Sequence, residues 1–227
     1  MIRKAIWKPL VAFASLLAAF AMFGVRGDSM AQEPSGEIVI VALGDSLTAG
    51  YQLPQEAAFP VQLEKALRSR GANVKVINAG VSGDTASDGL ARLDWALPED
   101  ADAVILELGA NDALRGIPVQ ETTRVLTELM EKLKERKLPV LVAGMEAPRN
   151  WGPDYVTAFR AMYADLAEKY DALLYPFFLD GVALDKSLSL PDGIHPTAKG
   201  VERIVERILP SVEALIAKVA KRRSEPS

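Results

Sequence analysis

The sequence predicts a three-layer α/β/α sandwich built on a five-stranded, mainly parallel sheet. Short apolar runs, the first of them strongly β-branched, alternate five times with longer segments whose apolar residues recur at helical spacing. This alternation is typical of a parallel sheet with helices on both faces. The chain has 227 residues and no internal repeat or linker, which suits one domain. Right-handed crossovers leave few topologies, and we expect the flavodoxin-like strand order 2-1-3-4-5.

The first 31 residues have the composition of a secretory signal peptide. Residues 9–25 carry no charge, Ser29-Met30-Ala31 has small residues at a cleavage position, and three cations provide the positive start: Arg3, Lys4 and Lys8. We predict cleavage after Ala31, which leaves residues 32–227 as a single domain, periplasmic or secreted, with no stable membrane anchor. The alternative is an uncleaved anchor, because the apolar stretch is at the short limit of a membrane span.

The composition excludes several kinds of site. The chain has no cysteine, so disulfides, thiolate nucleophiles and iron–sulfur or zinc–thiolate sites are impossible. His195 is the one histidine, which excludes a multi-histidine metal site; we expect neither a metal nor a cofactor. The formal net charge is −4, and it falls to −7 without residues 1–31, which carry four basic groups and one acidic group. An acidic exported protein is a poor candidate for binding nucleic acid.

The first half of the domain reads as two rounds of strand and helix. Residues 38–42 are an uninterrupted β-branched run, which indicates a buried strand. A helical stripe follows at 60–70, where Pro60 suits a first turn. Residues 75–79 form the second strand, and a glycine-rich turn at 80–85 comes next. That turn leads into a helix through Leu90, Leu93 and Leu97 that stops at Pro98.

The second half repeats the pattern. The order is a strand at 103–108, a helix at 119–136, a strand at 139–143, a helix at 154–170, a strand at 173–177, an irregular segment at 178–191 and a last helix at 197–218 with a charged tail. In helix 119–136, four apolar residues share one face: Val125, Leu126, Leu129 and Leu133.

Ser46 lies just beyond the first strand, in Gly44-Asp45-Ser46-Leu47. A serine at the carboxyl end of a parallel strand faces the crevice where such sheets bind ligands, a position that suits a nucleophile. The alternative is a plain turn, since Gly, Asp and Ser are common turn residues. A serine hydroxyl becomes a nucleophile only with a base and a group that orients the base.

His195 is the one available imidazole base, in Asp192-Gly193-Ile194-His195-Pro196 before the last helix. Asp192 lies three residues earlier, and in a tight loop this spacing brings its carboxylate to Nδ1, which leaves Nε2 for Ser46. The alternative is a surface histidine capped by a local aspartate.

Acyl transfer also needs donors to the oxyanion. The Ser46 and Gly83 backbone N–H groups and the Asn111 side-chain amide are the candidates, because their turns follow three strands that end at one sheet edge. The alternatives are a turn glycine at Gly83 and a cap or turn residue at Asn111. Three neighbouring aspartates are interpreted as acceptors that brace the loops rather than as catalytic groups: Asp45, Asp84 and Asp112.

Four motifs in this order resemble the sequence blocks of the GDSL, or SGNH, hydrolase family: Gly-Asp-Ser-Leu at 44–47, Ser-Gly-Asp-Thr at 82–85, Gly-Ala-Asn-Asp at 109–112 and Asp-Gly-Ile-His-Pro at 192–196. The resemblance implies a nucleophile at Ser46, oxyanion donors at Ser46, Gly83 and Asn111, and the Asp–His pair at Asp192 and His195. The longer runs Gly-Asp-Ser-Leu-Thr-Ala-Gly-Tyr and Leu-Gly-Ala-Asn-Asp-Ala-Leu-Arg-Gly are similar to the exported bacterial thioesterase/lysophospholipase/arylesterase subgroup. There the loop matching 144–152 lies near the acyl pocket.

The function expected from these residues and this resemblance is hydrolysis of carboxylic esters and thioesters of acyl chains, including lysophospholipids, through an acyl-enzyme on Ser46. Apolar residues beside the last loops favour acyl chains, although they equally suit the core: Phe177, Phe178, Leu179, Leu188 and Leu190. One alternative is a carbohydrate O-acetylesterase. The other is a non-catalytic periplasmic binding protein on the same fold.

Overall fold

The computed structural model describes residues 36–224, together with Ile2. The predicted signal peptide and its cleavage site after Ala31 otherwise lie outside the described residues, so cleavage stays a prediction. The described chain begins directly before the first strand and ends with the last helix.

Five strands form one sheet, and the predicted order 2-1-3-4-5 is confirmed. The strands are β1 (Ile38–Gly44), β2 (Val74–Gly80), β3 (Ala103–Glu107), β4 (Val140–Ala143) and β5 (Leu173–Tyr175). Every neighbouring pair is parallel. Gly44 is in register with both Gly80 and Glu107, so β1, β2 and β3 end level with one another. The segments that follow these strands therefore leave from the same edge of the sheet.

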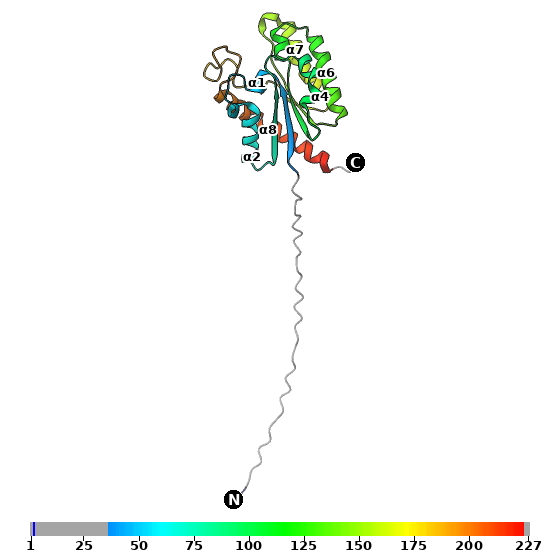
Figure 1. Ribbon diagram of the computed structural model, residues 1–227, viewed down its shortest axis with the longest axis vertical. Coiled ribbons are helices and arrows are strands. Elements are labelled where there is room, and N and C mark those ends of the chain that lie inside the picture. The colour runs from blue at the N-terminus through cyan, green and yellow to red at the C-terminus, as the bar shows by residue number, and fades with distance from the viewer. Residues whose placement is uncertain (1, 3–35, 225–227) are drawn as a thin grey trace. The chain divides into compact units, whose positions relative to one another are not determined.

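Helices cover both faces of the sheet (Figure 1). One face carries α2 (Phe59–Ser69) and α8 (Ala198–Ser224), which pack against each other. The other face carries α3 (Ala86–Ala91), α4 (Leu93–Ala96), α6 (Val119–Glu135) and α7 (Pro153–Lys169). Short helices follow two of the strands: α1 (Ser46–Ala49) after β1 and α5 (Ala110–Leu114) after β3. Short 3₁₀ helices are formed by Gln55–Ala57 and by Arg149–Trp151.

The hydrophobic core lies between the sheet and these helices. The four apolar residues predicted for one face of α6 are all buried, which confirms that stripe. On the opposite face, the rings of Phe59 and Phe178 are fully buried and meet edge to face, with their centroids 4.9 Å apart. Phe178 comes from the loop after β5, so part of that irregular segment is anchored in the core.

The helix predicted to run to Pro98 is instead two short helices, α3 and α4, separated at Arg92. Arg92 leaves helical geometry, and its side chain turns toward the sheet edge. There Nε donates to Asp84 at 2.6 Å and Nη2 donates to the Gly44 carbonyl at 2.9 Å. The sequence pattern marks the apolar face of this segment correctly but misses the break, because the Gly44 carbonyl that Arg92 binds is 48 positions away in sequence.

The last helix is longer than predicted. It continues past Lys218 to Ser224, so these residues of the predicted charged tail are helical. The added turns are held by ion pairs to Asp102: Arg222 at 3.3 Å and Arg223 at 2.6 Å. These contacts give the charged residues a fixed partner at the opposite edge of the sheet from the candidate site. Between residues 36 and 224, none of the helices combines the length and apolar character that crossing a membrane requires.

Candidate active site

Ser46 is the first residue of α1, and Asp45 alone separates it from the end of β1. Asp45 caps this helix by accepting a hydrogen bond from the Leu47 N–H at 3.0 Å. Gly44 makes the turn possible, because a Cβ there would collide with the side chains of Thr48 and Glu107. The backbone N–H of Ser46 lies in the first helical turn, whose N–H groups have no partner within the helix.

His195 meets Ser46 from the loop that precedes α8. Its Nε2 is 2.9 Å from Ser46 Oγ, although the two residues are 149 positions apart. The ring of Tyr51 lies beside the imidazole, with the two centroids 4.4 Å apart and the planes tilted by 38°. Sequence reasoning missed Tyr51, although it lies only five residues after Ser46.

Asp192 binds the opposite side of His195. Its Oδ2 is 2.7 Å from Nδ1, and its Oδ1 accepts the backbone N–H groups of Ile194 at 2.9 Å and of His195 at 3.0 Å. These backbone hydrogen bonds, together with the imidazole, lower the pKa of Asp192 to about 2. The carboxylate is therefore ionised and can only accept, so Nδ1 carries the proton and Nε2 is free to accept from Ser46.

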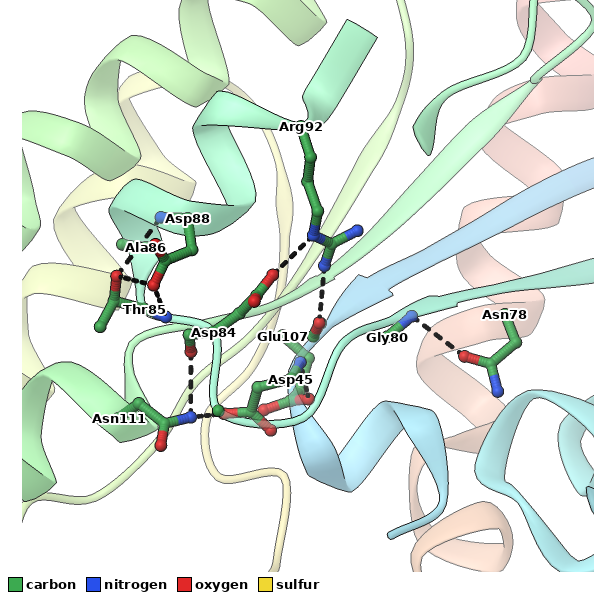
Figure 2. A network of polar contacts seen from close by, with 12 residues as sticks. Asp45, Asn78, Gly80, Asp84, Thr85, Ala86, Asp88, Arg92, Glu107 and Asn111 are labelled. Carbon is green, nitrogen blue, oxygen red and sulfur yellow. Dashed lines mark hydrogen bonds and ion pairs between the residues drawn. The ribbon is translucent and has the colours of Figure 1, made fainter. Parts of the chain in front are cut away.

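Asn111 is tied into the same edge of the sheet (Figure 2). It lies in α5, and the position before that helix suits Gly109 for two reasons: its φ is 111°, and a side chain there would collide with Tyr163. The Asn111 Nδ2 donates to Asp45 Oδ2 at 3.1 Å and to the Asp84 carbonyl at 2.9 Å. An amide nitrogen has two hydrogens, and both are used by these acceptors.

Gly83 lies in the turn that follows β2. Its φ is 91°, and its carbonyl accepts a hydrogen bond from Arg115 at 2.7 Å. Asp84, the next residue, connects the turn to Asn111 through its carbonyl. The structure thus brings together Ser46, His195 and Asp192 directly, and joins Asn111 to them through Asp45. The catalytic roles assigned to these residues stay predictions.

Glu107, which sequence reasoning missed, forms a buried pair of acids with Asp45, whose predicted role as a loop-bracing acceptor is confirmed by its contacts with Leu47 and Asn111. Glu107, the last residue of β3, is fully buried; its Oε2 accepts from Thr48 Oγ1 at 2.8 Å and from the Asp45 N–H at 3.3 Å. Burial, reinforced by the charge of Asp45, raises the pKa of Glu107 well above its usual range. Burial also raises the pKa of Asp45, to about 6. A carboxylate at the end of an otherwise apolar strand was the signal available in the sequence.

A cavity of about 450 Å³ opens beside Ser46 and His195. Its apolar lining comes from the turn after β3, the loop after β4 and the loop after β5, and includes Leu114, Met145, Ala147, Phe177, Leu179 and Val182. Of the residues expected to favour acyl chains, Phe177 and Leu179 line this cavity, whereas Phe178 belongs to the core. Within the described part of the chain, no group of three or more potential ligand side chains could hold a metal ion.

The fold and the Ser–His–Asp arrangement define the class of protein as an α/β serine hydrolase. The sequence of residues 42–203 matches the model of the "GDSL-like Lipase/Acylhydrolase family". The chain belongs to this family, as its four motifs indicated.

Named relatives agree with this membership. The chain is 38% identical to an arylesterase from Vibrio mimicus over 84% of this chain and 94% of the relative. It is 36% identical to "Thioesterase 1/protease 1/lysophospholipase L1" from Escherichia coli (strain K12), over 78% of this chain and 84% of the relative. Among solved structures, that of AlinE4, described as an SGNH-hydrolase family esterase, is 47% identical with a TM-score of 0.67, covering 78% of this chain and 96% of that one.

Proposed function

We propose that this protein hydrolyses carboxylic esters and thioesters of acyl chains through an acyl-enzyme on Ser46. The observation that carries the proposal is the continuous hydrogen-bonded path from Ser46 Oγ through His195 to Asp192, at 2.9 and 2.7 Å. Membership of an acylhydrolase family and an apolar cavity beside Ser46 support the same conclusion. The small-molecule substrate would occupy that cavity.

The direction of these hydrogen bonds defines the path of the proton in the reaction. His195 Nε2 takes the Ser46 proton as Oγ attacks the acyl carbon, and the imidazolium that forms lies against ionised Asp192. The Ser46 and Gly83 N–H groups and the Asn111 amide are proposed to bind the oxyanion. The imidazolium then gives its proton to the leaving alcohol or thiol. Water, activated in turn by His195, releases the acid and restores Ser46.

A substrate panel tests this function. We expect purified residues 32–227 to hydrolyse p-nitrophenyl esters with longer chains more efficiently than the acetate, and to act on an acyl thioester and a lysophospholipid, because the cavity lining is apolar. Acetylated carbohydrate as the one substrate turned over would instead support an O-acetylesterase. Absence of turnover on the whole panel would contradict the proposal and favour a binding protein.

Replacing Asn111 with alanine is expected to lower kcat by about 10²–10³, with a smaller effect on KM, as for the loss of one oxyanion donor. The hydrogen bonds of Asn111 to Asp45 and Asp84 place its amide nitrogen at the sheet edge that bears Ser46. Steady-state kinetics on one p-nitrophenyl ester would measure both constants. A variant with only a raised KM would show that Asn111 binds substrate and does not stabilise the oxyanion.

We also propose export with removal of residues 1–31. The charged start, the apolar run and Ser29-Met30-Ala31 support it. In a secreting bacterial host, N-terminal sequencing of the exported protein is expected to begin at Gln32. Mature protein that keeps its first 25 residues and remains in the membrane fraction would contradict cleavage.

A further inference from the structure

The carboxylate of Asp45 joins two parts of the candidate site. Oδ1 accepts from the Leu47 N–H in the turn that carries Ser46. Oδ2 accepts from the Asn111 amide (Figure 2). Asp45 itself is only 1% exposed, so water does not compete for these contacts. The nucleophile turn and the proposed oxyanion donor, 65 residues apart in sequence, thus share one acceptor group.

We propose that Asp45 is a positioning residue for the reaction: its ionised carboxylate holds the Asn111 amide in a fixed relation to the Ser46 turn. This proposal rests on the proposed function. With the amide plane already fixed, the developing oxyanion shares one of its N–H groups in a three-centre bond without reorganisation of the side chain.

The arrangement requires an acceptor on both oxygens of residue 45. Both partners, the Leu47 N–H and the Asn111 Nδ2–H, are donors. An asparagine side chain at this position has one oxygen and one NH₂ group, so either orientation sets a donor against a donor. A protonated aspartic acid has the same defect, because its O–H would face one of the two donors. Asp45→Asn therefore conserves shape and specifically disturbs one of the two contacts.

Within the acid pair of Asp45 and Glu107, the surroundings favour the negative charge on Asp45. Glu107 lies beneath it at the end of β3, fully buried, and is the neutral partner because its pKa is raised well above the usual range. His195 faces Asp45 from the loop before α8, and the imidazolium that forms during the reaction would favour the ionised form of Asp45. On the β2 side, Asp84 is paired with Arg92, which also binds the Gly44 carbonyl. With a pKa of about 6, Asp45 is ionised above that pH and protonated below it.

A double-mutant cycle tests whether Asp45 acts through Asn111. We expect Asp45→Asn to lower kcat on a p-nitrophenyl ester by about 10–100-fold, less than removal of the donor itself. In the Asn111→Ala background the same change is expected to cost less than about twofold, because the new amide can turn its oxygen to Leu47 without opposing a second donor. An equal loss in both backgrounds would overturn the proposal and leave Asp45 as a helix cap alone.

Asp88→Asn is the matched control. Asp88 is also an aspartate in a capping interaction, with Thr85 at the start of α3, but it has no hydrogen bond to Asn111. We expect this variant to keep the wild-type kcat within about twofold. Thermal unfolding of all variants shows whether a lost activity reflects lost structure.

A second readout does not depend on turnover. The Asn111 side-chain amide signals in an ¹H–¹⁵N spectrum, identified by their loss in Asn111→Ala, are expected to shift in the wild type as pH passes through about 6 and to stay constant in Asp45→Asn. Persistence of the shift in Asp45→Asn would overturn the proposal, because His195 would then be its source. A wild-type protein that showed the shift but hydrolysed no ester would contradict the proposed function and leave the positioning contact intact.

Discussion

Ser46→Ala is expected to lower kcat for ester hydrolysis by about 10⁶, as in serine-triad enzymes that lose their nucleophile. The change removes one oxygen atom, whose contact in the free protein is with His195 Nε2 at 2.9 Å. Because Ser46 is the first residue of α1 and alanine is a good helix former, we expect α1 to remain intact. The loss should therefore be a loss of chemistry and not of structure.

The measurement is the rate of p-nitrophenyl ester hydrolysis, with thermal unfolding as the control for folding. A melting temperature within a few degrees of wild type would match the expected exchange of a small side chain. Retention of a tenth of the wild-type rate would show that Ser46 is not the nucleophile. Thr48→Val is the control for loss of a hydroxyl group, because the Thr48 hydroxyl is buried against Glu107. This variant keeps the Ser46 hydroxyl, so its activity should far exceed that of Ser46→Ala.

Asp192→Asn is expected to lower kcat by up to about 10⁴, as in the well-studied protease triad. The asparagine oxygen can still accept from the Ile194 and His195 N–H groups, so its NH₂ group is turned toward Nδ1. The imidazole must then accept at Nδ1 and carry its proton on Nε2, facing Ser46. In that tautomer it cannot take the Ser46 proton.

The same substitution is expected to move the acid limb of kcat/KM to lower pH. Asp192, with a pKa of about 2, stays ionised across the assay range, and its negative charge favours the protonated imidazole. Removing the charge makes that protonated form less favourable, so activity survives to lower pH. A neutral ester is the appropriate substrate, because it adds no limb of its own.

Asp45, whose pKa burial raises to about 6, also changes its charge within the pH range of the assay. The single histidine provides a direct control. The imidazole Cε1–H signal of His195 can be followed by NMR in the wild type and in Asp192→Asn, and its midpoint should fall in the variant. A midpoint that stays in place would contradict the pairing of Asp192 with His195.

Much of the architecture follows from local patterns. The five strand positions are marked by short apolar runs, β-branched in all but the last, and right-handed crossovers then restrict the strand order. The contact between Asp192 and His195 is local, since the two residues are three positions apart in one loop. His195 contacts Ser46 because the loop before α8 lies at the same edge of the sheet as the turn after β1.

The remaining features depend on contacts between distant residues. Glu107 meets the Asp45 N–H across 62 positions, because β1 and β3 are neighbours in register. Arg92 reaches the Gly44 carbonyl across 48 positions, and α3 and α4 are separated there. The two acceptors of the Asn111 amide likewise come from other turns. No periodicity or local motif reports such pairings, so the sequence identified the residues of the site but not how the buried acids connect them.

The central claim is that Ser46 is an activated nucleophile, and reaction with a fluorophosphonate probe tests it most directly. Attack of Ser46 Oγ on phosphorus would form a stable Oγ–P bond and release fluoride, with the proton taken by His195. Mass spectrometry of the intact protein and of its peptides is expected to show one adduct, on Ser46, in the wild type and none in Ser46→Ala. An unmodified wild-type protein, or an adduct on another residue, would contradict the claim.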